Sequence, residues 1–96
     1  MENAPLSGLI VELAREVQAE LDARYAQPGA PLPGSPLDQA GLRDGFAIVD
    51  DYLRHGEAGV ALDHLLYMIR EPDIALSPQS LAKLNSVAAV LRRPTR

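Results

Sequence analysis

The sequence predicts an all-α protein, a small bundle of about four helices with a proline-rich loop after the first. Leucine occurs 15 times and alanine 14 times among 96 residues, against 11 for valine, isoleucine and threonine combined, a balance that favours helix over sheet. Apolar residues recur at three- and four-residue spacing, and prolines and glycines separate these segments. Because 96 residues suffice for one core only, we expect a single helical domain over residues 1–96.

The first segment has the apolar spacing of an amphipathic helix over about residues 5–26. Its inward stripe would consist of Leu6, Leu9, Ile10, Leu13, Val17 and Leu21. Residues 27–36 then contain four of the eight prolines and two of the seven glycines. Prolines remove backbone hydrogen-bond donors and fix the backbone in extended or turn conformations, so we expect a loop of about ten residues here.

A second helix is predicted over about residues 37–55. Ser35, Pro36 and Asp38 have the order of a helix start: a capping serine, a proline and an acid near the positive end of the helix dipole. Gly41 and Gly45 each disfavour a helix by up to about 1 kcal/mol relative to alanine, so we attribute them to the close approach of another helix. The inward face would consist of Leu42, Phe46, Val49 and Leu53.

Two further helices are predicted in the second half of the chain. The third covers about residues 57–71 and ends before Pro72, and because its apolar arc nearly encircles the axis, it should be the most buried helix. The fourth covers about residues 78–92 and starts with Ser77 as cap and Pro78 at the first position. Its apolar stripe would consist of Leu81, Leu84, Val87, Ala88 and Leu91.

The charge distribution suggests a protein partner. The net charge is −4, which disfavours direct nucleic-acid binding because such binding depends on cations that neutralise phosphates. Residues 37–76 hold eight acids and three bases (−5), whereas residues 77–96 hold four bases and no acid (+4). Such a field can steer a basic partner. The alternative is that these charges only keep the protein in solution.

Little in the chain points to catalysis, a metal or a membrane. There is no cysteine, and His55 and His64 do not have the spacing of a helical metal-ligand pair. No nucleotide-binding loop or nucleophile motif occurs, and the longest apolar runs are five residues. We therefore expect no enzyme activity, cofactor, metal or membrane insertion. The absence of a signal-peptide pattern leads us to expect a cytoplasmic protein.

Two polar faces are candidates for a binding surface. Glu12, Glu16 and Glu20 repeat every four residues on the first predicted helix, where they form either a charged ridge for a partner or a solvated face. On the third helix, a rotation of 100° per residue brings five polar side chains into a sector of about 120°: Asp63, His64, Tyr67, Arg70 and Glu71. A tyrosine framed by charges is typical of an interface anchor. Alternatively, Tyr67 covers a neighbouring helix with its hydroxyl in water.

Residues 51–65, DYLRHGEAGVALDHL, resemble the segment written hGE.giAle.L in MafI-type immunity proteins of bacterial polymorphic toxin systems. The segment Ile74–Ser77 is similar to that family's entry into its last helix, and the resemblance covers about residues 40–92. It implies a small bacterial protein that binds and neutralises the C-terminal effector domain of a cognate toxin. The family provides no catalytic residue and no toxin contacts that transfer by position.

Charge and resemblance together predict an immunity protein that inhibits its toxin by stoichiometric contact. A nuclease toxin is one class with a cationic cleft that an acidic inhibitor can occupy. We expect the toxin-binding residues on the second and third helices: Asp50, Asp51, Arg54, Asp63, His64, Tyr67, Arg70 and Glu71. The alternative is a homodimeric structural or regulatory helical module without a toxin partner, in which Gly41, Gly45 and Phe46 form the dimer contact.

Overall fold

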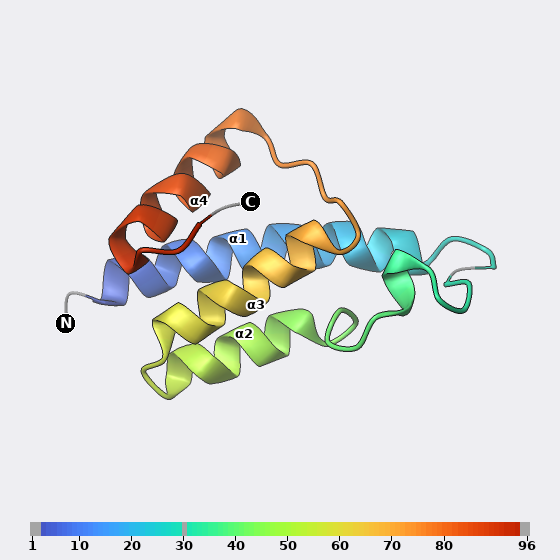
Figure 1. Cartoon of the computed structure of the whole chain (residues 1–96), viewed down its shortest axis with the longest axis horizontal. Helices are drawn as coiled ribbons and strands as arrows, with labels where there is room; N and C mark the ends of the chain where they lie inside the picture. Colours follow the sequence, from blue (N-terminus) through green and yellow to red (C-terminus); the bar gives the residue numbers. More distant parts are fainter. Residues whose placement is uncertain (1–2, 30, 95–96) are drawn as a thin grey trace.

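The chain folds into four α-helices, as the sequence predicts (Figure 1). A computed structural model describes residues 3–29 and 31–94, and within these ranges it contains no strand. The helices are α1 (Asn3–Tyr25), α2 (Gly45–Arg54), α3 (Ala58–Arg70) and α4 (Pro78–Leu91), and a short 3-10 turn, η1 (Pro36–Asp38), lies between α1 and α2.

The longest helix, α1, contacts all three of the others. Helices α2 and α3 form a hairpin against one side of α1, while α4 packs on another side of α1 and meets α3 only slightly (Figure 1). The core accordingly centres on the inward face of α1, where Ile10, Leu13, Val17 and Leu21 of the predicted stripe are buried together with Ala14, and Leu6 and Leu9 are partly buried.

Helix α3 has the highest share of buried residues, as its wide apolar arc predicts. Within its 13 residues, five are buried: Ala61, Leu62, Leu65, Leu66 and Met68. The helix lies between α2 and α1, so both sides of its arc find apolar neighbours. Its bounds differ from the predicted 57–71 by one residue at each end.

The predicted start of the second helix at residue 37 is wrong. Pro36–Asp38 forms only the 3-10 turn, turns and bends follow, and the α-helix begins at Gly45. Gly41 has a φ of +84°, a left-handed conformation that no α-helix contains. Ser35 precedes the 3-10 turn without a side-chain capping bond, so the capping pattern identified a turn and not the helix.

The predicted close approach of another helix explains Gly45, whereas Gly41 lies before α2 in a left-handed conformation. A Cβ atom on Gly45 would lie 2.5 Å from Cε of Met68, so α2 can approach α3 this closely only through a glycine. A Cβ atom on Gly41 would lie 2.9 Å from Cε1 of His64. Gly45 is buried, and Gly41 and Phe46 are half-buried, so the homodimer contact expected at Gly41, Gly45 and Phe46 is not a fully exposed patch.

Helices α2, α3 and α4 each end with a left-handed residue: Gly56 (φ +73°), Asp73 (φ +58°) and Arg92 (φ +57°). In each case the N–H of the left-handed residue donates to the carbonyl three residues earlier, and the N–H of the next residue donates to the carbonyl five residues before it. This pair of hydrogen bonds is the Schellman motif. The prediction that Pro72 ends the third helix through its effect on the preceding residue is wrong, because Glu71 keeps helical dihedral angles (φ −59°, ψ −51°). A turn over residues 71–73 follows α3, and the chain reverses at the left-handed Asp73.

Helix α4 starts as predicted. The backbone N–H of Ser80 donates to Oγ of Ser77 at 3.1 Å, which is the expected cap. Leu84, Val87 and Ala88 are buried, but Leu81 is 46% exposed and does not belong to the inward stripe. Helix α4 packs mainly on α1 and meets α3 only slightly, so one helix buries most of its apolar stripe.

Candidate functional site

Two residues of the predicted binding sector hold the loop before α2. The hydroxyl of Tyr67 donates to the carbonyl of Ala40 at 2.6 Å, and Nε2 of His64 bonds to the carbonyl of Gly41 at 2.9 Å. Because the carbonyl can only accept, Nε2 of His64 carries the hydrogen. The two rings lie 5.4 Å apart, and Tyr67 packs against the core. Tyr67 is therefore half-buried, and its hydroxyl is bonded to the loop before α2.

A residue that the sequence analysis did not single out, Gln18, holds the other side of this loop. Its Nε2 atom on α1 donates to the carbonyls of Leu42 (3.2 Å) and Arg43 (3.1 Å), and its Oε1 atom accepts the backbone N–H of Phe46 at 2.8 Å. The first turn of α2, where Asp44 makes no side-chain capping bond, is thus capped from α1. A single glutamine carries no sequence signal for this role.

Tyr25 completes the support of the loop at the end of α1. Its hydroxyl donates to the carbonyl of Leu37 at 2.8 Å, and the guanidinium of Arg43 lies over its ring at 4.1 Å from the centroid. Burial raises the pKa of the Tyr25 hydroxyl above its ordinary value, although the charge of Arg43 opposes this rise. The whole segment from Leu37 to Phe46 is therefore anchored by α1 and α3.

Two other residues of the predicted polar sector on α3, Asp63 and Arg70, contact the segment after α4. Nε of Arg93 lies 2.8 Å from Oδ1 of Asp63, and Nη2 of Arg70 donates to the carbonyl of Pro94 at 3.0 Å. A Cβ atom on Gly59 would lie 2.6 Å from Nη2 of Arg93, so the guanidinium rests directly on the helix backbone. Asp63 and Arg70 thus fasten the chain after α4 to α3.

The glutamates of α1 face α4 and their own helix. Glu12 pairs with Lys83 of α4 at 3.3 Å, Glu16 accepts a hydrogen bond from the hydroxyl of Ser80, and Glu20 pairs with Arg24 at 3.1 Å. This ridge is therefore engaged in contacts within the molecule.

Helix α2 presents exposed carboxylates to solvent. Asp51 lies on its outer side with 69% of its side chain exposed, and Asp50 pairs with Arg54 at 2.8 Å within the same helix. Asp44, just before the helix, is exposed, as is Glu57 after it. We call these four carboxylates, Asp44, Asp50, Asp51 and Glu57, the α2 acidic face.

His55 lies within this face. Its Nδ1 atom is 2.8 Å from the carbonyl oxygen of Asp51 and 3.6 Å from the Oδ1 atom of the same residue. The bond to the Asp51 backbone, followed by the charges of Asp51 and Glu57, raises the pKa of His55 above 6.5. Protonated His55 would partly neutralise the face.

The eight residues predicted to bind a toxin do not form one patch. Asp50, Asp51 and Arg54 share the outer side of α2. His64 and Tyr67 turn to the loop, and Asp63 and Arg70 turn to the C-terminal segment, as described above, while Glu71 is exposed at the end of α3. Helical spacing predicts which residues lie on one face of α3, but it cannot predict that the loop before α2 and the C-terminal segment contact this face.

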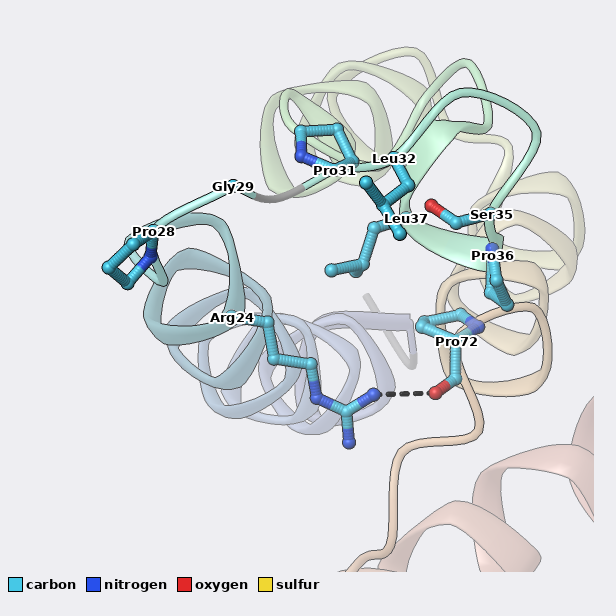
Figure 2. Close-up of a pocket in the computed structure, with 9 residues that line it drawn as sticks. All are labelled: Arg24, Pro28, Gly29, Pro31, Leu32, Ser35, Pro36, Leu37 and Pro72. Atoms are coloured by element: carbon cyan, nitrogen blue, oxygen red, sulfur yellow. Dashed lines mark hydrogen bonds between the residues drawn. The ribbon is translucent and has the colours of Figure 1, made fainter.

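A pocket of about 520 Å³ opens at the proline-rich loop, beside the end of α1 (Figure 2). No local pattern in the sequence indicates this pocket. Its walls are mostly apolar: Pro28, Pro31, Leu32, Pro36, Leu37 and Pro72. Two polar side chains, Arg24 and Ser35, also line it. A second hollow of about 340 Å³ shares Pro31 and Leu37 with this pocket and extends to Asp44.

The comparisons with family models, with curated proteins and with solved structures give no match for this chain. Across residues 3–29 and 31–94, no group of three or more histidines and carboxylates is arranged to hold a metal ion. In the same part of the chain, no helix combines the length and the apolar character that crossing a bilayer requires.

Proposed function

We propose that this chain is a bacterial immunity protein of the MafI type, which acts in the cytoplasm and neutralises the effector domain of a cognate toxin by stoichiometric contact. The α2 acidic face carries the proposal, because Asp51 on α2 and Asp44 and Glu57 at its two ends are exposed carboxylates, with the ion-paired Asp50 beside them. A cationic cleft, such as that of a nuclease, has the complementary charge. The sequence resemblance of residues 51–65 supports the same function.

The binding surface that we propose lies on α2 and not on the polar sector of α3. Asp50, Asp51 and Arg54 remain from the original expectation, and Asp44 and Glu57 join them. The side chains of α3 are less suitable, because His64 and Tyr67 already bond to the loop before α2. In this arrangement, α3 holds the loop before α2 and so positions the α2 acidic face, which binds the toxin.

The anchored loop supports this role in a second way. The segment that leads into α2 bonds to Gln18 on α1 and to His64 and Tyr67 on α3, so the acidic face is held in one position before any partner arrives. A surface that is already ordered loses less conformational entropy on binding. Small inhibitors with a rigid charged surface can therefore combine fast association with slow dissociation.

The proposal is tested by co-expression of this chain with the product of the adjacent gene. We expect a 1:1 complex that survives size-exclusion chromatography, and protection of cells that produce the toxin domain. The double variant Asp51→Asn/Glu57→Gln should protect less. Its control, Asn85→Lys/Ser86→Lys, raises the net charge by the same two units on exposed positions of α4. No complex with the neighbouring product, or equal protection by both variants, would contradict the proposal.

A homodimeric module remains the second candidate, now with a different contact. Leu81 of α4 is 46% exposed, and an exposed apolar side chain of this kind could pack against a second copy. Sedimentation equilibrium decides between the two candidates. A dimer that Leu81→Lys disrupts would favour the module, whereas a monomer at every concentration would exclude it.

A further inference from the structure

The α2 acidic face contains one side chain whose charge changes near neutral pH. Of the two histidines in the chain, His64 is half-buried and bonded to the loop before α2, whereas the side chain of His55 is 66% exposed beside Asp51. Histidine ordinarily gains or loses its proton between about pH 5 and pH 8, a range in which exposed carboxylates stay ionised. Protonation of His55 therefore changes the charge of this surface.

The turn after α2 holds the imidazole in place. His55 is the C-cap residue of α2, and its Nδ1 atom bonds to the carbonyl of Asp51 at 2.8 Å. The backbone N–H groups of His55 and Glu57 both donate to the carbonyl of Tyr52, at 3.1 and 2.9 Å, so this turn is fixed against the end of the helix. Because a carbonyl only accepts, Nδ1 carries the hydrogen of the neutral ring, and Nε2 is the atom that takes up the proton.

The surroundings of the ring favour its protonated form. The bond to the Asp51 carbonyl raises the pKa of His55 most, Oδ1 of Asp51 lies 3.6 Å from Nδ1, and Glu57 adds a second negative charge. The C-terminal end of a helix also stabilises a cation. Among the described residues, Asp51 and Glu57 are the charged side chains that act on this ring, because Arg54 is turned to Asp50 at 2.8 Å. The charge of the ring therefore changes close to neutral pH.

We infer that His55 is a pH-sensitive switch of the α2 acidic face, which slows the association of a cationic partner when the ring is protonated. Asp50 and Arg54 form an ion pair whose charges cancel, whereas Asp51 and Glu57 together carry −2. Protonated His55 reduces this local charge from −2 to −1, and a smaller opposite charge steers a partner less. The inference rests on the proposed function for the identity of the partner, whereas the change of charge is a property of this chain alone.

Two substitutions at this position reproduce the two states of the switch in the complex with the toxin effector domain. His55→Gln has no charge at any pH, and His55→Lys is charged throughout. At low salt, we expect the wild type to associate as His55→Gln does at about pH 8.5, and about two- to fivefold more slowly, as His55→Lys does, at about pH 6. Gln79→Lys is the matched control, because it adds one charge at an exposed position of α4 and should change the rate much less.

The same rates show which of the two claims fails. If the complex forms and His55→Gln and His55→Lys associate equally fast, the inference is wrong while the proposed function stands. The inference is also wrong if the wild type follows His55→Gln at both pH values, or if Gln79→Lys slows association as much as His55→Lys.

The isolated protein tests the switch without the toxin. Since binding and protonation are linked, a cationic ligand of this face lowers the pKa of His55 by the factor by which protonation weakens its binding. NMR titration with excess hexalysine should lower this pKa by about 0.3 to 0.7, the equivalent of a two- to fivefold factor. Sodium chloride at the same ionic strength is the control, and an equal fall in both solutions would overturn the inference. If no toxin complex forms but hexalysine lowers the pKa as described, the switch stands and the proposed function fails.

Discussion

The side-chain amide of Gln18 on α1 caps α2 through Phe46: Oε1 of Gln18 accepts the backbone N–H of Phe46 at 2.8 Å. The same side chain donates to two carbonyls just before the helix. A helix start usually bonds to a local cap, but Asp44 makes no such bond here. The position of α2, and with it the acidic face, thus depends on a residue about 28 positions earlier in the chain.

We therefore expect Gln18→Ala to lower the free energy of unfolding by about 1 to 2 kcal/mol, because it leaves one amide and two carbonyls without their partner. Urea denaturation measures the change. Gln79→Ala is the control, since Gln79 is exposed on α4. An equal effect of the two substitutions would show that Gln18 does not cap α2.

Tyr67→Phe should loosen the loop before α2 without unfolding the protein. It removes the hydroxyl that donates to the carbonyl of Ala40 but keeps the ring against the core. We expect a loss of about 0.5 to 1.5 kcal/mol in stability. Hydrogen exchange should accelerate at the amides of residues 41–46. Unchanged exchange at these amides would mean that the hydroxyl does not hold the loop.

Ser77→Ala should destabilise the protein by about 0.5 to 2 kcal/mol through the loss of the cap on α4. Ser86→Ala, at an exposed position inside the same helix, should be neutral or slightly stabilising, because alanine is the better helix former. Thermal denaturation of the two variants measures the difference. The account of α4 fails if Ser77→Ala has the midpoint of the wild type.

The raised pKa of His55 predicts a small dependence of stability on pH. The contacts with Asp51 raise the pKa in the folded state above 6.5, so protonation stabilises the fold. This contribution is fully present below about pH 6.5, the ordinary value, and is lost as the pH rises through the folded pKa. His55→Gln should remove that part of the pH dependence. If NMR titration gave His55 a pKa below 6.5, the sign would be wrong.

The sequence predicted the helices from patterns that act locally. The three- and four-residue spacing of apolar residues located all four, and Ser77 with Pro78 located the start of α4. It misplaced the start of α2, because Ser35 and Pro36 begin a turn with the same local chemistry as a helix. The actual start depends on Gln18 in α1, a contact across 28 positions that no local pattern carries.

The candidate site was predictable only in part, for the same reason. The acids of α2 are visible as an excess of charge, and Asp51 is as exposed as its position suggests. Tyr67 and Asp63 have the same polar character, but Tyr67 bonds to the loop before α2 and Asp63 pairs with Arg93 of the C-terminal segment. The pocket combines the prolines of one loop with Pro72 from another part of the chain, which only the folded structure brings together.

The association rate with the toxin effector domain, measured over a range of salt concentrations, tests the central claim most directly. For the wild type we expect fast association that slows steeply as salt is added, because exposed carboxylates steer the encounter. Asp51→Asn/Glu57→Gln should associate several times more slowly and with a weaker dependence on salt, while Asn85→Lys/Ser86→Lys should retain the steep dependence of the wild type. If the two double variants changed the rate and its dependence on salt equally, the overall charge and not the α2 acidic face would govern binding, and the account would be contradicted.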